Sequence, residues 1–199
     1  MRVLKTLVTF CSLFLVASAA PATQKDSVMS SIATFSEAVQ ANKDAINRYH
    51  GGSLAAIPVG QKCYDCWYAL REAHSKLTDA KFTPSESEEV VKQFTSLNQD
   101  SIDLLNLYRD KAPVLNQASV SFIVPIMMQA LFREADDYSA ALQALMPEKD
   151  IAPMKQITVD HKAAWDEAFA AYDPTRNTAP VQQWKSLMSV FSPALTYLI

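Results

Sequence analysis

The sequence has little glycine, little cysteine and no strong excess of charge of either sign. Only 3 of its 199 residues are Gly and only 3 are Cys. Scarce glycine excludes an all-β protein of many tight turns and a nucleotide fold built on glycine-rich loops. The net charge of −3 excludes a strongly basic nucleic-acid-binding protein. With 49% hydrophobic and 20% charged residues, the chain is too apolar for intrinsic disorder.

Motifs of common catalytic and metal sites are also missing. The sequence has no Gly-x-Ser-x-Gly elbow, no His-Glu-x-x-His, no phosphate-binding glycine loop and no EF-hand spacing. His50 follows a predicted helix end, while His74 and His161 fall on apolar stripes, where a core histidine is more common than a base. We therefore expect no catalytic residues, no cofactor and no bound metal.

The first residues have the composition of a secretory signal peptide. Two basic residues precede an apolar run over 7–16, and four small residues follow at 17–20. The apolar run is too short to span a membrane. We expect residues 1–19 to be removed as a signal peptide, which leaves 20–199 as a single exported domain.

Apolar residues recur every three or four positions along most of the remaining chain, which is typical of amphipathic helices. The stripes predict long helices over residues 28–49, 63–77, 84–112, 120–146 and 150–172, followed by a shorter helix over 180–191. No strand pattern, internal repeat or low-complexity linker interrupts them. The predicted fold is therefore all-α, a bundle of five long helices with a short C-terminal sixth helix.

Helix boundaries follow from glycine, proline and capping residues. The glycines at 51–52 are expected to end the first helix, and residues 53–60 to form a loop. The sequence Thr-Pro-Ser-Glu at 83–86 predicts a capping box at the start of the third helix. We expect Pro113 to end that helix and Asp150 to cap the fifth.

The predicted fourth helix contains the most apolar stretch of the chain after the first twenty residues. Residues 120–131 are apolar on nearly every face of a helix. In a protein of a single helical domain, such a stretch is typical of a helix surrounded by others. The sequence therefore predicts that this helix is the central one.

Cys63 and Cys66 are the only cysteines outside the predicted signal peptide. Outside the cell, two nearby cysteines are usually oxidised, and a spacing of three residues at a helix start brings them within bridging distance. We expect a local disulfide. Free buried thiols, a redox-active pair and a metal site are the alternatives, but no strand precedes Cys63 for a thioredoxin-like site and no paired histidines complete a metal site.

The apolar stripes combine large aromatic rings with alanines and methionines. Such a mixture can leave an elongated void between long helices, because methionine adapts to ligands of varying shape. The same side chains can also pack into a solid core. If a void exists, its expected lining is Phe35, Trp67, Phe94, Met127, Leu131, Trp165 and Phe169.

Several segments resemble those of one protein family. They are Ile-Asn-Arg-Tyr-His-Gly-Gly at 46–52, Ala-Ala-Ile at 55–57, Ala-Leu-Gln-Ala-Leu-Met-Pro at 141–147 and Ala-Phe-Ala-Ala-Tyr at 168–172. In their order the chain resembles the fungal hydrophobic surface binding protein A and cell-wall galactomannoprotein family. The likeness spans residues 25–172, and residues 173–199 extend past it.

The resemblance implies an extracellular or cell-wall-associated helical bundle. In that family the bundle encloses a cavity for fatty acids or adsorbs to hydrophobic surfaces, so the implied partners are a fatty acid or another small hydrophobic ligand, cell-wall polysaccharide and hydrophobic surfaces. We expect a fatty-acid-binding protein, not an enzyme. A wall or adhesion protein without a defined ligand is the alternative, and a thiol oxidoreductase that uses Cys63 and Cys66 is a second alternative.

Overall fold

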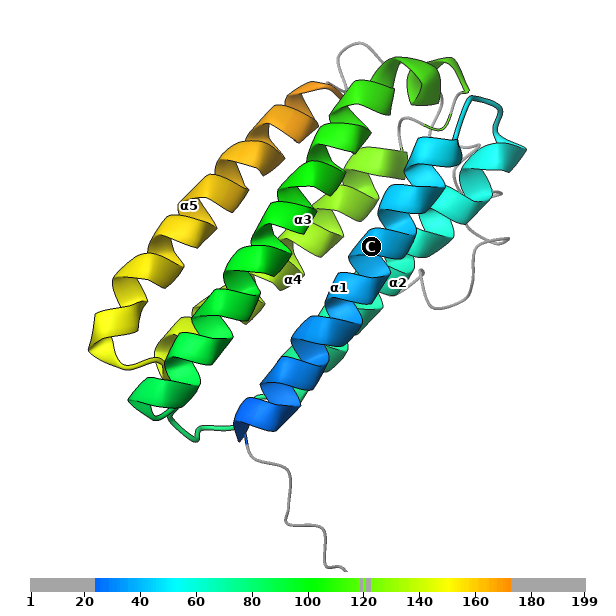
Figure 1. Cartoon of the computed structure of the whole chain (residues 1–199). Coiled ribbons are helices and arrows are strands. Elements are labelled where there is room, and N and C mark those ends of the chain that lie inside the picture. The colour runs from blue at the N-terminus through cyan, green and yellow to red at the C-terminus, as the bar shows by residue number, and fades with distance from the viewer. Residues whose placement is uncertain (1–23, 119, 121–122, 173–199) are drawn as a thin grey trace, which may run out of the picture.

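The structure is a computed structural model, and it describes residues 24–118, 120 and 123–172. In this part of the chain there are five α-helices and one short 3-10 helix, and no strand (Figure 1). They are α1 (Gln24–Arg48), η1 (Leu54–Ala56), α2 (Ile57–Ser75), α3 (Pro84–Gln117), α4 (Ile123–Leu145) and α5 (Glu148–Ala170). The all-α prediction is confirmed. The predicted signal peptide and the predicted helix over 180–191 lie outside the described residues.

The five helices form a closed ring. Helix α1 packs against α2 and α3, α3 packs against α5, and α4 completes the ring between α5 and α2. The helices lie side by side along one direction, as Figure 1 shows. Among these neighbours, α4 and α5 pack least closely. The ring gives every helix one face toward a common interior.

The prediction that the fourth helix is central was wrong. Helix α4 is one wall of the ring, and its outward face carries the exposed residues Ile126, Arg133 and Asp137. Ile126 is 40% exposed although it belongs to the apolar stretch. The stretch misled the prediction because Gln129 is the one polar residue on the outward face of α4 before Arg133.

Two predicted boundary signals are confirmed, the glycines that follow α1 and the capping box at the start of α3. Gly51 and Gly52 follow α1 with φ angles of 121° and 89°, in a region that favours glycine. At the start of α3, the Thr83 backbone amide donates to Glu86 Oε2 over 2.8 Å, and the Glu86 amide donates to Thr83 Oγ1 over 3.4 Å. This reciprocal pair satisfies two amides that the helix itself leaves without acceptors.

Two proline-based predictions of helix boundaries were wrong. The expected loop over 53–60 contains η1 and the first turn of α2, because Pro58 lies in that first turn, where a missing N–H costs nothing. Helix α3 continues through Pro113 to Gln117. Proline removes one backbone hydrogen bond there, but buried Ala112 and Leu115 on either side keep this turn packed against the core.

The cap of α5 also differs from the prediction. Pro147 occupies the N-cap position, and the Asp150 amide donates to its carbonyl oxygen over 3.0 Å. Asp150 therefore lies inside the first turn of α5, where a carboxylate still complements the helix dipole.

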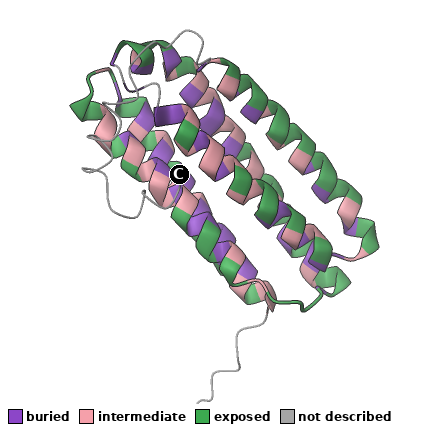
Figure 2. Cartoon of the chain, turned by 180° about the vertical axis from the view of Figure 1, so that it is seen from behind, coloured by how far each residue is buried: buried purple, intermediate pink, exposed green. Residues whose placement is uncertain are grey.

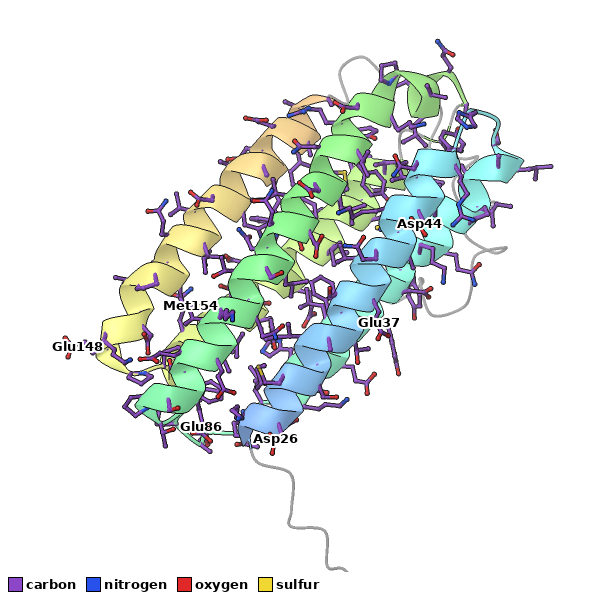
Figure 3. All side chains as sticks on the ribbon, viewed as in Figure 1. Asp26, Glu37, Asp44, Glu86, Glu148 and Met154 are labelled. Atoms are coloured by element: carbon purple, nitrogen blue, oxygen red, sulfur yellow. The ribbon has the colours of Figure 1, made fainter. Side chains whose placement is uncertain are left out.

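Burial follows the inward faces of the helices, as Figure 2 shows. On α1 the buried residues recur every three or four positions, and they are Val28, Ser31, Ile32, Phe35, Val39, Asn42 and Ile46. Figure 3 shows the opposite arrangement for the carboxylates of Glu37 and Asp44, which are exposed on the outer side of α1. Met154 of α5 is 0% exposed. The core therefore lies inside the ring, and each helix contributes buried side chains to it.

Candidate functional site

Two adjacent voids lie inside the ring, within the described part of the chain. Four residues line both of them, namely Phe35 of α1, Ser101 of α3, Ala135 of α4 and His161 of α5. The first void has a volume of about 30 Å³ and the second of about 20 Å³. Each has room for about one water molecule, whereas pockets for drug-sized ligands measure roughly 300–1,000 Å³. A large guest therefore requires side chains or helices to move apart.

The first void reaches all five helices and has a mixed lining. Apolar side chains such as Leu70 and Ile157 face it together with the polar side chains of Asn98, Ser101 and Thr158. Exposed Asp136 and Lys162 belong to the same lining, from the neighbouring helices α4 and α5. This void therefore extends toward water at the seam between these two helices.

The second void is lined mainly by apolar side chains. Leu104 and Leu105 of α3 face Met128 and Leu131 of α4 across it. Trp165 closes one side, with its ring centroid 5.6 Å from that of Phe132. Side by side, the two voids give the interior a polar part and an apolar part.

Two buried donors in these linings have no hydrogen-bond partner among the described residues. They are the hydroxyl of Tyr138, a residue that lines the first void, and the indole N–H of Trp165, a residue that lines the second. Tyr138 is 2% exposed and Trp165 is 3% exposed. Buried donors are nearly always paired in native proteins, so these two indicate places where a water or a ligand atom belongs.

His161 lies between the two voids as a neutral ring. It lines both, and its ring centroid is 5.9 Å from that of Trp165. Burial among apolar neighbours lowers the pKa of His161 to about 4, because the charged form loses its hydration. At neutral pH the imidazole is uncharged and compatible with an apolar interior.

The depressed pKa of His161 predicts a loss of stability in mild acid. Below the pKa of about 6.5 of an unfolded histidine, the unfolded chain binds a proton that the folded chain excludes down to about 4. The free energy of unfolding should therefore fall by about 1 to 2 kcal/mol between pH 7 and pH 5 through this residue. Urea unfolding of the wild type and of His161→Leu at both values measures it. An equal pH dependence in the two proteins would contradict the prediction.

Four of the seven predicted lining residues face the voids. Phe35 lines both, Phe94 lines the first, and Leu131 and Trp165 line the second. They come from four different helices, so the ring brings together residues that are up to 130 positions apart in the sequence.

The other three do not line either void. Trp67 of α2 is partly buried at the edge of the core, where its ring is 5.5 Å from that of Tyr64 and the Arg71 guanidinium lies 5.1 Å from its centroid. Met127 is only partly buried, and its neighbour Met128 takes the inward position with 2% exposure. Phe169 stacks behind Trp165, with ring centroids 5.6 Å apart.

Several lining residues were not predicted. Met128, Ala135 and Tyr138 belong to one stripe of α4 with Leu131, at intervals of three and four residues. This spacing identifies them once Leu131 is taken as the inward position. His161 was assigned to an apolar stripe as a core histidine, and the same stripe places it one turn before Trp165.

The structure corrects the prediction of a disulfide, because Cys63 and Cys66 are both free thiols. The prediction assumed that they lie at a helix start. They occupy the middle of α2 instead, since this helix begins at Ile57, and both face the core with 4% and 0% exposure. Each thiol has its own polar contact there, as Asn42 Nδ2 lies 3.7 Å from Cys66 Sγ and Tyr108 interacts with Cys63.

This environment also disfavours a redox-active pair. Burial raises the pKa of the Cys63 thiol to about 12 and also raises the pKa of the Cys66 thiol. Reactive cysteines require the thiolate, which forms in exposed, electropositive surroundings. The structure thus matches the alternative of free buried thiols.

The sequence matches the family model of hydrophobic surface binding protein A over residues 26–144. The chain belongs to this family, as the resemblance predicted. None of the curated proteins matches its sequence.

Solved structures with the same fold include fatty-acid complexes. One is Afmp4p in complex with palmitic acid, with a TM-score of 0.72 and 20% identity over 75% of this chain and 99% of that one. Another is ligand binding domain 1 of Penicillium marneffei MP1 protein complexed with arachidonic acids, with a TM-score of 0.71 and 17% identity over 76% of this chain and 99% of that one. A third is ligand binding domain 2 of the same protein in complex with arachidonic acids, with a TM-score of 0.71 and 19% identity over 75% of this chain and 94% of that one.

No helix in the described residues is both long enough and apolar enough to cross a membrane. Within the same residues, no three acidic, histidine or cysteine side chains gather where they could hold a metal ion. The interior of the ring is therefore the strongest candidate site in the described part of the chain.

Proposed function

We propose that this protein binds a fatty acid or a similar apolar molecule in the interior of its helical ring. The observation that carries the proposal is the pair of adjoining voids, which share Phe35, Ser101, Ala135 and His161 and whose linings leave two buried donors without partners. Two similar structures of the same fold are complexes with palmitic acid and with arachidonic acids.

Binding of a fatty acid requires the interior of the ring to enlarge. The voids are much smaller than a long acyl chain, so helices must separate, and the seam between α4 and α5 is the least closely packed. A buried methylene group contributes about 0.8 kcal/mol, so twelve of them contribute about 10 kcal/mol before the cost of association. Micromolar affinity is the expected range.

The test is uptake of palmitic acid by protein that lacks residues 1–19 and has been freed of lipid. Native mass spectrometry should detect a complex, and calorimetry should give a dissociation constant in the micromolar range. Protein that is helical by circular dichroism and yet forms no complex would reject the proposal.

A second candidate function is adsorption to hydrophobic surfaces, which the family description favours. Large apolar side chains are exposed on the outer surface, including Leu54 at 82%, Val159 at 60% and Tyr68 at 55%. Hydrophobic beads should then deplete the protein from solution at moderate salt. A folded protein that stays in solution argues against this function.

We further propose that the protein is exported and remains outside the cell or in the cell wall. The family assignment and the signal-peptide composition of residues 1–19 support this location. Cell-wall polysaccharide as a partner rests on the family resemblance alone.

A further inference from the structure

We propose that the first void holds the polar head of the bound molecule, and that the Tyr138 hydroxyl donates a hydrogen bond to an oxygen of this head. The inference rests on the proposed function and specifies the ligand class as a long-chain carboxylic acid. Its carboxyl group lies beside Tyr138, and its chain extends into the second void.

Tyr138 is the strongest reason for this assignment. The residue is 2% exposed and lines the first void, and its buried hydroxyl has no partner among the described residues. The ring itself is fixed by its neighbours, with centroids 6.2 Å from His74 and 6.4 Å from Phe94. A donor that lacks an acceptor, on a ring held in place beside a void, is suited to an oxygen atom of a ligand.

Several other polar groups of the same void have partners or face water. Ser139 Oγ and Thr158 Oγ1 lie 2.8 Å apart, and the Gln143 amide donates to both oxygens. Asp136 and Lys162 are exposed where the void reaches the seam between α4 and α5. Among the described residues that line the first void, Tyr138 is the one whose fully buried polar atom has no partner, so its hydroxyl has the most to gain from a ligand oxygen.

The second void is suited to the chain. Its lining is mostly aliphatic or aromatic, and it joins the first void at the four shared residues, so a linear molecule can occupy both. The Trp165 N–H is a competing position for the head, since it also lacks a partner. It lies, however, among the rings of Phe132, His161 and Phe169, which offer a carboxyl group no further donor except the neutral imidazole.

The experiment compares a ligand that has a head with one that has none. Dodecanoic acid and dodecane are titrated into the wild type, Tyr138→Phe, Tyr49→Phe and Trp165→Phe by calorimetry. Tyr49 is the matched control, because its buried hydroxyl also lacks a partner but lines neither void. Removing an unpaired hydroxyl leaves the ring packing intact, so the tyrosine variants should fold.

We expect Tyr138→Phe to lower the affinity for dodecanoic acid about tenfold, which is the size expected for the loss of a hydrogen bond to a carboxyl group. The affinity for dodecane should not change. Tyr49→Phe should change neither. With dodecanoic acid labelled with ¹³C at its carboxyl carbon, the bound resonance should shift in Tyr138→Phe and not in Tyr49→Phe.

Three outcomes would overturn the assignment. They are an unchanged affinity of Tyr138→Phe for the acid, an equal loss for the acid and the alkane, and a selective loss for the acid in Trp165→Phe instead. In all three the wild type still binds, so the proposed function stands. If the wild type binds neither ligand, the proposed function itself fails.

Discussion

Replacement of Ala135 by leucine is expected to lower the affinity for palmitic acid about thirty-fold. Ala135 lines both voids from α4, so the three added carbon atoms occupy the space of two to three chain methylenes. At about 0.8 kcal/mol for each methylene excluded, the loss is about 2 kcal/mol. Calorimetric titration of the lipid-free protein with palmitic acid measures it.

The matched control is Ala140→Leu, because Ala140 lies on the same helix and is exposed. Its affinity should equal that of the wild type. Overpacking by Ala135→Leu costs at most about 1 to 3 kcal/mol of stability, so thermal unfolding followed by circular dichroism verifies that the variant is folded. Equal affinities of the two variants would mean that the ligand does not occupy the space beside Ala135.

Replacement of Asn42 by alanine is expected to lower the free energy of unfolding by about 3 kcal/mol. Asn42 of α1 is 0% exposed and connects two other helices, since its Oδ1 accepts from the Tyr108 hydroxyl of α3 over 3.0 Å and its Nδ2 lies 3.7 Å from Cys66 Sγ of α2. Alanine leaves the Tyr108 hydroxyl without this acceptor and creates a small cavity. Each effect costs about 1 to 3 kcal/mol.

Urea unfolding measures the loss, with Asn47→Ala as the control. Asn47 lies on the same helix and is exposed, so its replacement should change stability by less than about 0.5 kcal/mol. If Asn42→Ala is no less stable than Asn47→Ala, the buried polar contacts of Asn42 do not stabilise the ring.

Local signals in the sequence predicted the helices, and tertiary packing decided the boundaries that they missed. The capping box of Thr83 and Glu86 was predictable because both partners lie within four residues. Whether Pro113 ends or only interrupts α3 depends on the packing of Ala112 and Leu115 against other helices, which no local pattern contains.

The sequence predicted which helices contribute large side chains to the candidate site, but not always which of two neighbouring residues faces inward. Phe35, Phe94, Leu131 and Trp165 were found because large apolar residues on a stripe face inward. Met127 was chosen over Met128 because the stretch around them is apolar on every side. The spacing of apolar residues therefore did not indicate which methionine faces inward. Trp67 lines neither void although its ring is large, which indicates that size alone does not determine whether a side chain reaches the centre.

The cysteines show the same limit. A spacing of three residues is compatible with a bridge at a helix start and with two unconnected thiols in a helix interior. The choice depends on where α2 begins, and Pro58 was taken to belong to a loop that precedes the helix. Once α2 begins at Ile57, both cysteines lie in regular helix and face buried partners.

The five described helices form a ring with none of them on its axis, so the width of the interior depends on inward side chains from every helix. One substitution on the inward face of any helix can widen or narrow the interior without disturbing the helix–helix packing that holds the ring closed. Selectivity for chain length can therefore diverge while the architecture persists. Proteins that share this architecture at 17–20% identity have had ample room for such divergence.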